Sequence, residues 1–244
     1  MMGPRDLGGT VHLWTIRCGS SNSDARGAEW LSAEERTRAD AFCSAGLQAR
    51  FRAAHIALRG ILGHYLGCSP DALGFRTDSL GKPALTTECD LRFNLSHSED
   101  IAVVGVGRGR ELGVDVERVP SVTLVDETEQ LVFTDRERLR LAATPEPARR
   151  GREFARLWTR KEAYLKALGA GLSLRLGDID VSMPGNRVWV RNGKEWRPDA
   201  RWTLQSMLVA DQVPGAVAAE GSGWQLRSFS WPEDAACSGI AATG

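Results

Sequence analysis

The chain has 244 residues, of which 42% are hydrophobic and 25% are charged, a composition typical of a soluble globular protein with one large domain or two smaller ones. Thirty-one basic residues balance thirty-one acidic residues, so bulk charge argues against nucleic acid or an anionic membrane as a partner. We find no secretion signal and no run of about 18 apolar residues that would span a membrane.

The cysteines are odd in number and lack the paired spacing of a zinc site or a redox dithiol. This pattern predicts a reducing compartment, and together with the missing signal it predicts a cytoplasmic protein. The last residues, 233–244, are small and polar and are expected to form a flexible tail. The five cysteines are Cys18, Cys43, Cys68, Cys89 and Cys237.

Helical signals dominate the first third of the chain. Ser32 and Glu35 have the spacing of a capping box, in which each side chain binds a backbone amide at the start of a helix. Residues 47–67 then carry apolar side chains at helical intervals up to a glycine. Short runs of strand-forming residues follow at 73–77, 91–97, 101–107 and 111–119.

The same order of helix and then strands comes a second time. A helical stretch is predicted at 122–141, where Thr134 and Glu137 repeat the capping-box spacing, and a longer helix at 149–168. Strands are predicted at 178–183, 187–190, 202–209, 215–220 and 224–230. We therefore expect an α+β fold of two similar halves, residues 1–112 and 113–232, with a ligand in the cleft between them.

Residues 113–119, GVDVERV, place two acids among valines. In a strand, Asp115 and Glu117 project to one face, while Val114 and Val116 project to the other. Adjacent carboxylates repel each other, so we expect a neutralising Lys or Arg, or a divalent cation that prefers oxygen ligands. The alternative is an edge strand whose polar face lies in water.

Two further segments carry groups that could serve a site. Glu162 and Lys166 lie four residues apart on one face of the predicted helix, where the alternative is an exposed ion pair. Ser96 and His97 would face opposite sides of a strand, which argues against a serine–histidine nucleophile pair. His97 is then left to bind an anion or to satisfy a turn.

Two glycine-containing segments are predicted to be turns. Residues 81–83, Gly-Lys-Pro, form a turn that presents a cation. Residues 105–110, GVGRGR, look like a dinucleotide-binding loop, but a strand follows them rather than a helix, so we predict a hairpin turn. No nucleophile elbow, HExxH or P-loop motif occurs in the chain.

Taken together, these segments resemble a known family of enzymes. GVDVE at 113–117, followed about forty residues later by WTRKEAYLK at 158–166, resembles the paired signature of 4'-phosphopantetheinyl transferases. The segments GKP, FNLSHS and ARFRAAHIALR, and the chain length, are similar to the larger, surfactin-synthetase-activating type. The resemblance covers about residues 30–175. It implies two α+β halves related by a pseudo-twofold axis, with coenzyme A and Mg²⁺ between them.

The resemblance also implies a role for each matching residue. Asp115, Glu117 and Glu162 match the acidic metal ligands, and Lys166 matches the lysine beside the pyrophosphate. Glu162, directly or through a metal-bound water, is expected to take the proton of the attacking serine, and Lys166 to stabilise the departing 3',5'-ADP. The groups expected to bind coenzyme A are Arg50, His97 and Arg38 at the 3'-phosphate, Lys82, Pro83 and Ser96 along the nucleotide, and Lys166. One departure is Glu35, which stands where a lysine might be expected.

The implied partners are coenzyme A and an apo acyl or peptidyl carrier protein, whose serine receives the 4'-phosphopantetheine group. The sequence leaves open fatty-acid, polyketide or nonribosomal-peptide synthesis, and we expect a monomer. Carrier proteins present an acidic helix beside that serine, so a local basic surface is expected, from the arginines at 136, 138 and 140 or at 149, 150 and 152. The alternatives are another Mg²⁺-dependent phosphotransferase without a carrier acceptor, or a non-catalytic coenzyme A-binding partner of a synthase.

Overall fold

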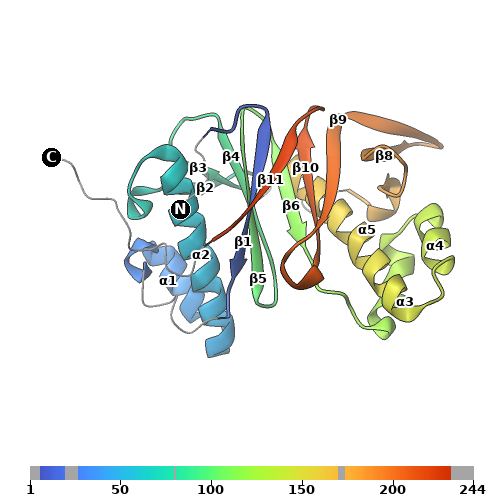
Figure 1. Cartoon of the computed structure of the whole chain (residues 1–244), viewed down its shortest axis with the longest axis horizontal. Coiled ribbons are helices and arrows are strands. Elements are labelled where there is room, and N and C mark those ends of the chain that lie inside the picture. Colours follow the sequence, from blue (N-terminus) through green and yellow to red (C-terminus); the bar gives the residue numbers. More distant parts are fainter. Residues whose placement is uncertain (1–5, 20–26, 80, 170–173, 232–244) are drawn as a thin grey trace.

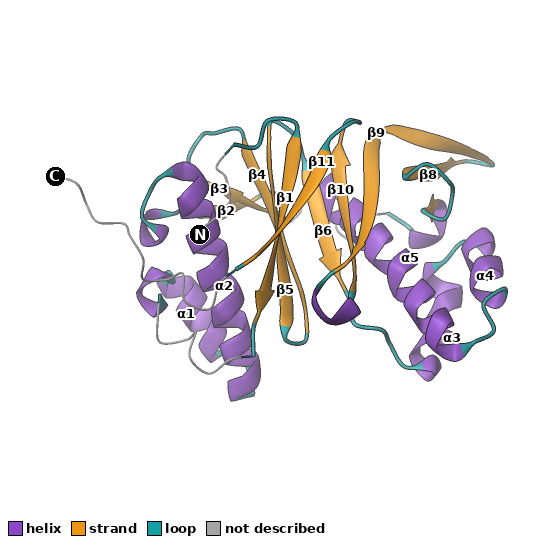
Figure 2. Cartoon of the chain, viewed as in Figure 1, coloured by secondary structure: helices purple, strands orange, loops and turns teal. Residues whose placement is uncertain are grey.

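The computed structural model describes residues 6–19, 27–79, 81–169 and 174–231 and arranges them in layers (Figure 1). Two sheets lie face to face in the middle, and helices cover the outer side of each (Figure 2). The first sheet has the order β11 (Gln225–Ser230), β1 (Thr10–Arg17), β5 (Ile101–Arg108) and β4 (Leu91–Ser98). The second has the order β6 (Leu112–Val116), β10 (Pro214–Glu220), β9 (Glu195–Leu208), β8 (Arg187–Asn192) and β7 (Ile179–Asp180).

The helices of the first half are α1 (Ala33–Asp40) and α2 (Ala45–Leu66), and α2 packs along the first sheet (Figure 1). The predicted capping box is present. The amide of Glu35 donates to Ser32 Oγ at 3.2 Å, and the amide of Ser32 donates to Glu35 Oε2 at 2.9 Å. The helix α2 ends at Gly67, whose φ of 67° lies in the left-handed region that glycine adopts without strain. Both helical predictions for this half are confirmed.

Strand β1 contradicts the expectation of a mainly helical first third. It lies inside the first sheet, between β11 and β5, and Arg17 is its only exposed residue. Trp14 packs on the side of the sheet that faces α2, whereas Leu13 packs between the two sheets. Because both faces of β1 are buried, the strand lacks the alternation of apolar and polar residues by which a half-buried strand is recognised.

The helices of the second half are α3 (Val122–Val132), α4 (Asp135–Ala142) and α5 (Pro147–Leu168). The predicted helix at 122–141 is therefore two helices, and the second begins at the predicted capping box. The amide of Glu137 donates to Thr134 Oγ1 at 3.2 Å, and the amide of Thr134 donates to Glu137 Oε2 at 2.9 Å. Helix α5 covers the outer face of the second sheet, as α2 covers the first (Figure 1). The two halves are thus similar α/β layers, as expected.

The predicted hairpin at 105–110 is wrong. Strand β5 ends at Arg108 and β6 begins at Leu112, but the two strands belong to different sheets. Gly109, with a φ of 65°, lies in the turn between them. The turn carries the chain from the first sheet to the second, so that β4 and β6, each at the edge of its own sheet, lie side by side.

Strand β11 comes last in the sequence but pairs in parallel with β1 of the first sheet. The division into residues 1–112 and 113–232 stays a prediction, and one strand crosses it. Separate apolar cores fill the space between each sheet and its helices, and a third fills the space between the sheets. This third core contains Val103, Val114 and Val116.

None of the helices in the described ranges is both long and apolar enough to cross a membrane. The cysteines in those ranges, Cys18, Cys43, Cys68 and Cys89, carry free thiols. Cys237 and the predicted tail at 233–244 lie outside the described residues.

Candidate active site

The strand β6 and the helix α5 approach each other most closely at Gly113. A Cβ atom at this position would lie 2.2 Å from the carbonyl oxygen of Ala163 and 2.3 Å from the amide nitrogen of Ala167. Backbone atoms cannot move aside as a flexible side chain can, so the approach requires glycine. It presses the last turns of α5 against the strand that carries Asp115.

The valines beside Asp115 anchor β6. Val114 and Val116 are 0% and 1% exposed and lie in the core between the sheets. Because side chains alternate along a strand, Asp115 points to the opposite side, toward Lys166 of α5. The valines therefore fix the direction of the carboxylate, as the alternation in the sequence predicted.

The Asp115 carboxylate is buried and only partly satisfied. Lys166 Nζ donates to its Oδ1 at 2.6 Å and to Ser96 Oγ at 2.9 Å, and Ser96 Oγ donates to the same Oδ1 at 2.8 Å. The second oxygen, Oδ2, has no hydrogen-bond partner among the described residues. Burial raises the pKa of Asp115, although Lys166 and Ser96 oppose the rise. A buried charged oxygen without a partner is costly, so the position suits a further cation.

Glu117 is held by the first half of the molecule. Ser98 Oγ donates to Glu117 Oε1 at 2.6 Å and accepts from the amide of Arg118 at 3.1 Å. Burial raises the pKa of Glu117, and the negative charge of Asp115 raises it further. The two strand acids therefore share one electrostatic environment, as expected from their spacing.

Glu162 brings a third carboxylate to the same environment. It is half-buried and forms no hydrogen bond or ion pair within the described ranges. Burial raises the pKa of Glu162, and the charges of Asp115 and Glu117 raise it further, while Lys166 lowers it. Glu162 therefore lies within electrostatic range of the two strand acids, although it follows them by more than forty residues in the sequence.

The acidic cluster, Asp115, Glu117 and Glu162, consists of carboxylates, the ligands that a hard divalent cation prefers. As the side chains stand, no three His, Cys, Asp or Glu side chains of the described residues are close enough together to hold one metal ion, and Lys166 supplies the cation. The donor chemistry nevertheless suits a hard cation, because three carboxylates repel one another and one buried oxygen lacks a partner.

The sequence analysis missed how β4 supports these acids. Asn94, Ser96 and Ser98 are alternate residues of β4 and face β6 across the junction of the two sheets. Asn94 Oδ1 accepts from the amide of Val114 at 2.8 Å, and the two serines hold the acids. The available signal was the alternation of Asn94 and Ser96 in the predicted strand at 91–97, continued by Ser98 one residue beyond it. The first half thus positions the catalytic candidates of the second half.

Lys82 ties the turn at 81–83 to the end of α5. Its Nζ donates to the carbonyl oxygen of Ala167 at 2.9 Å and to Glu111 Oε2 at 2.8 Å. Gly81 has a φ of 88°, which confirms the predicted turn, and Pro83 is exposed at the start of β3 (Pro83–Leu85), which pairs with β2 (Phe75–Thr77). Lys82 is therefore bound within the protein, and its contact with a nucleotide stays a prediction.

His97 lies among other basic groups. On β4 it points away from Ser96, which is buried, whereas His97 is exposed. Desolvation lowers the pKa of His97, and the nearby charges of Lys166, His55 and Arg38 lower it further. Such a group of basic side chains suits an anion, which would relieve their mutual repulsion.

Of the two arginines expected at the 3'-phosphate, Arg38 and Arg50, only Arg38 is among the charges that act on His97. The charge of Arg38 acts on His97, whereas that of Arg50 acts on Asp100. His55, which the sequence analysis did not single out, stacks on Phe51 with ring centroids 4.0 Å apart, and Arg38 lies over the same ring at 5.4 Å. The basic group nearest His97 therefore contains Arg38 and His55, and a role for Arg50 stays a prediction.

Glu35 has a structural role that explains its departure from the family pattern. Its carboxylate binds His55 Nδ1 at 3.0 Å and accepts from Arg59 Nε at 2.6 Å, which joins α1 to α2. Burial opposes ionisation, but hydrogen bonds from His55, from the Ser32 amide and from Arg59 lower the pKa of Glu35 to about 2.

Two basic residues of the WTRKE segment are structural as well. Lys161 is fully buried, and its Nζ lies 2.7 Å from Glu137 and donates to the carbonyl oxygens of Val132 and Leu176. Arg160 is 3% exposed and donates to the carbonyl oxygen of Val181 at 3.0 Å. Arg160 and Lys161 therefore attach α5 to the rest of the second half, whereas Glu162 and Lys166 of the same helix face the acidic cluster.

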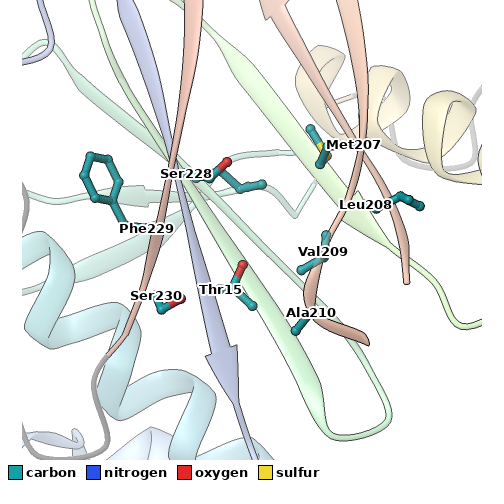
Figure 3. Close-up of a pocket in the computed structure, with 9 residues that line it drawn as sticks. Thr15, Met207, Leu208, Val209, Ala210, Ser228, Phe229 and Ser230 are labelled. Atoms are coloured by element: carbon teal, nitrogen blue, oxygen red, sulfur yellow. The ribbon is translucent and has the colours of Figure 1, made fainter. Parts of the chain in front are cut away.

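A pocket of about 180 Å³ lies away from the acidic cluster, where the end of β9 meets β1 and β11 (Figure 3). Its lining contains no charged residue and none of the predicted site residues. Thr15, Ser228 and Phe229 line one side of it, and Val209 and Ala210 line the other (Figure 3). It therefore offers none of the chemistry found at the acidic cluster.

Known proteins share the segments that build the acidic cluster. A family model described as the 4'-phosphopantetheinyl transferase superfamily matches residues 111–218, which contain all three acids and Lys166. The 4'-phosphopantetheinyl transferase HetI of Nostoc sp. is 34% identical over 229 residues, which cover 92% of this chain and 94% of that protein. A 4'-phosphopantetheinyl transferase of Bacillus subtilis is 27% identical over 164 residues, covering 67% of this chain and 71% of that protein.

A relative from an animal shares a similar length of the chain. The L-aminoadipate-semialdehyde dehydrogenase-phosphopantetheinyl transferase of Xenopus laevis is 26% identical over 229 residues, which cover 84% of this chain and 74% of that protein. With this coverage, the chain belongs to the 4'-phosphopantetheinyl transferase superfamily.

Proposed function

We propose that the enzyme transfers the 4'-phosphopantetheine group of coenzyme A to a serine of an apo acyl or peptidyl carrier protein and releases 3',5'-ADP. The reaction depends on Mg²⁺. The observation that carries the proposal is the acidic cluster beside Lys166 at the junction of the two halves. The free thiols support a reducing compartment, and we propose that the enzyme acts in the cytoplasm as a monomer.

Asp115, Glu117 and Glu162 would hold the Mg²⁺ ion. The ion, when bound, would neutralise the repelling carboxylates and polarise the pyrophosphate of coenzyme A. The unpartnered Oδ2 of Asp115 is the strongest local support, because it is buried, charged and free to bind a cation. Ser96 and Ser98 would keep the two strand acids in place.

Glu162 would accept the proton of the serine hydroxyl as the serine oxygen bonds to the β-phosphorus and the bond to 3',5'-ADP breaks. Glu162 has no hydrogen-bond donor of its own in the described ranges, so its carboxylate is free to accept the proton, directly or through a metal-bound water. Lys166 would then stabilise the charge on the departing phosphate.

Coenzyme A would bind through the groups that surround the acidic cluster. His97 with the neighbouring Arg38 and His55 would take the 3'-phosphate, with Arg50 as a further candidate. Lys166 would reach the pyrophosphate, and the remaining predicted contacts to the nucleotide are Lys82, Pro83 and Ser96. Of these, Lys82 and Ser96 already contact α5 of the second half, through the carbonyl oxygen of Ala167 and through Lys166 Nζ.

The test is transfer itself. The enzyme is incubated with coenzyme A, MgCl₂ and an apo carrier protein, and the carrier is examined by mass spectrometry for the added phosphopantetheine. Glu162→Ala and Asp115→Ala should fold and fail to transfer, while Glu127→Gln, a change at an exposed acid, should transfer normally. Transfer at the wild-type rate by either alanine variant, or by an enzyme freed of metal with a chelator, would overturn the assignment.

A further inference from the structure

Glu111 lies where the chain passes from the first sheet to the second. It directly precedes β6, and its backbone is bound by Glu220, the last residue of β10. The amide of Glu111 donates to Glu220 Oε2 at 3.3 Å, and the amide of Glu220 donates to the carbonyl oxygen of Glu111 at 2.9 Å. The backbone of Glu111 is therefore attached to the second sheet, and its side chain reaches back to the first half.

The side chain of Glu111 binds two cations of that half. Arg92 Nε of β4 donates to Oε1 at 2.8 Å, and Lys82 Nζ donates to Oε2 at 2.8 Å. Burial opposes ionisation, but the hydrogen bonds and charges of Lys82 and Arg92 lower the pKa of Glu111. The carboxylate is therefore charged near neutral pH, and it holds Lys82, whose side chain is only 14% exposed.

Lys82 in turn binds the C-terminal end of α5. The last four carbonyl groups of a helix lack an amide partner within the helix. The amide of Gly169 binds the carbonyl oxygens of Leu165 and Lys166. Lys82 Nζ donates to the carbonyl oxygen of Ala167 at 2.9 Å, and a cation at this end also interacts favourably with the helix dipole. The last turn of α5 is therefore held by a side chain from the other half.

The turn that carries Lys82 packs against the same end of α5. The amide of Lys82 donates to Asp78 Oδ1 at 2.8 Å, and the amide of Asp78 donates to the carbonyl oxygen of Lys82 at 3.0 Å. A Cβ atom at Gly169 would lie 3.4 Å from Asp78 Oδ2 and 3.5 Å from Lys82 Cδ, which are ordinary contact distances. The turn and the end of the helix therefore touch at more than one hydrogen bond.

Lys166 directly precedes Ala167, so the carbonyl group that Lys82 binds lies next to the lysine of the site. Lys166 Nζ donates to Asp115 Oδ1 at 2.6 Å and to Ser96 Oγ at 2.9 Å. A misplacement of about 1 Å in a reacting group costs about 100-fold in rate. The position of the last turn of α5 therefore matters for the step in which Lys166 takes part.

We infer that Glu111 is a positioning residue for transfer, because its carboxylate holds Lys82 on the carbonyl oxygen of Ala167 and so fixes the turn that carries Lys166. This inference rests on the proposed function, in which Lys166 stabilises the departing 3',5'-ADP. Glu111 acts through Lys82. Loss of the Glu111 carboxylate leaves the Lys82 ammonium free to bind a phosphate, so coenzyme A binds at least as tightly while transfer becomes slower.

The experiment separates the rate of transfer from the binding of coenzyme A. Glu111→Leu replaces the carboxylate by an apolar side chain of similar size, whereas Glu111→Gln keeps an oxygen that accepts from Lys82. Transfer to an apo carrier protein gives kcat and the KM for coenzyme A, and calorimetry gives the Kd of coenzyme A. We expect kcat to fall about 10–100-fold in Glu111→Leu and less in Glu111→Gln, while neither KM nor Kd rises. A wild-type kcat in Glu111→Leu, or a higher KM with an unchanged kcat, overturns the inference.

A double variant tests whether Glu111 acts through Lys82. Glu111→Leu/Lys82→Met should have the kcat of Lys82→Met alone, because Glu111 has no further effect once the ammonium group is gone. If the two losses in kcat multiply instead, Glu111 does not act through Lys82 and the inference is overturned. All assays are made well below the Tm of each variant, and a fall in kcat that disappears there would show a loss of folded enzyme only and would also overturn the inference.

Asp90→Asn is the matched control, because it removes a carboxylate that pairs with Arg108 of the first sheet at 2.6 Å. It should keep the wild-type kcat. An equal fall in kcat in Asp90→Asn and Glu111→Leu would show a general effect of charge and would overturn the positioning role. If the wild-type enzyme transfers the group to no carrier protein, the proposed function itself fails, whereas a wild-type rate in Glu111→Leu removes only the role of Glu111.

Discussion

The ammonium nitrogen of Lys166 lies 2.6 Å from Oδ1 of Asp115, and this ion pair joins the last turn of α5 to the C-terminal end of β6. The Asp115 side chain is 6% exposed and that of Lys166 is 30% exposed, so the lysine reaches the buried acid from the surface. Ser96 of the first half completes the contact. One lysine therefore neutralises only part of a cluster of three carboxylates.

Lys161 and Lys166 lie on the same helix and should respond in opposite ways to replacement by methionine. Lys161→Met leaves the buried Glu137 carboxylate without its cation and should lower the free energy of unfolding by about 3–5 kcal/mol. Lys166→Met should cost less stability, because Lys166 is partly exposed, but should abolish transfer. Urea unfolding and the mass-spectrometric transfer assay measure the two effects. A greater loss of stability in Lys166→Met would contradict the division of roles.

Replacing Glu162 by glutamine should make the protein more stable and less active. Folding raises the pKa of Glu162, so the ionised side chain is less stable in the folded protein than in the unfolded chain. The neutral amide removes this cost, so the Tm measured near neutral pH with a chelator and no Mg²⁺ should rise, while transfer in the presence of Mg²⁺ falls at least about 100-fold. The gain in Tm should shrink as the pH falls from the raised pKa toward the ordinary glutamate pKa of 4.5, and it should be absent below that pH. A lower Tm in the variant near neutral pH would be inconsistent with the raised pKa.

Replacing Gly113 by alanine should separate β6 from α5. The added Cβ would meet backbone atoms at 2.2 and 2.3 Å, which neither element can relieve without moving. We expect a loss of about 1–3 kcal/mol in the free energy of unfolding, and a loss of transfer larger than the stability change explains, because Lys166 moves away from Asp115. Gly46→Ala, in α2, is the control, since nothing lies within 4 Å of its Cβ position. If Gly113→Ala and Gly46→Ala had the same free energy of unfolding and the same transfer rate, the close contact between β6 and α5 would be contradicted.

Replacing Ser98 by alanine should weaken the binding of metal. The change removes the 2.6 Å hydrogen bond to Glu117 and leaves the carboxylate free to turn away from Asp115. Loss of a group that orients a metal ligand typically costs about 10–100-fold in metal affinity. Calorimetric titration with MgCl₂ measures it directly, without a carrier protein. Ser228→Ala, at an exposed position on β11, should leave the affinity unchanged, and an unaltered affinity in Ser98→Ala would exclude this supporting role.

Replacing Glu35 by glutamine should make stability depend differently on pH. The pKa of Glu35 is lowered from 4.5 to about 2, so its carboxylate stabilises the folded state above about pH 4.5, and this contribution is lost as the pH falls toward 2. A shift of that size corresponds to about 3 kcal/mol. Urea unfolding near pH 7 should show a free energy of unfolding that is lower in the variant by about that amount. The difference between wild type and variant should become smaller below pH 4.5. A difference in the free energy of unfolding that stays constant with pH would contradict the lowered pKa of Glu35.

Local signals in the sequence predicted most of the elements. The capping boxes at Ser32 and Thr134 depend on side chains three residues apart, and both are present. The long helices end at glycines that the sequence displays directly. Strand β1 was missed because both of its faces are buried by partners distant in sequence. The turn at Gly109 was taken for a hairpin because its residues do not record which sheet the next strand joins.

For the site, too, the sequence predicted the local relationships but not the contacts between distant segments. The spacing of Asp115 and Glu117, and of Glu162 and Lys166, predicts shared faces, and the structure brings the acids into one environment. The alternating polar residues of β4 indicate a polar face, but the contact of Ser98 with Glu117 joins two sheets, and no local pattern predicts which strand that face meets. The expected metal set, the general base and the nucleotide contacts stay predictions, which the variants above address.

Strand β11 also determines how the protein can be shortened or divided. Phe229 of β11 stacks on Trp14 of β1 with ring centroids 4.9 Å apart, and the strand forms the outer edge of the first sheet. A truncation after Glu220 would leave β1 unpaired along one side and uncover Trp14. The exposed edge of β1 could then pair with another copy of the chain and promote self-association. Neither half can therefore be cloned as an independent module by a single cut, and a two-fragment version would have to carry 225–230 on the fragment that contains β1.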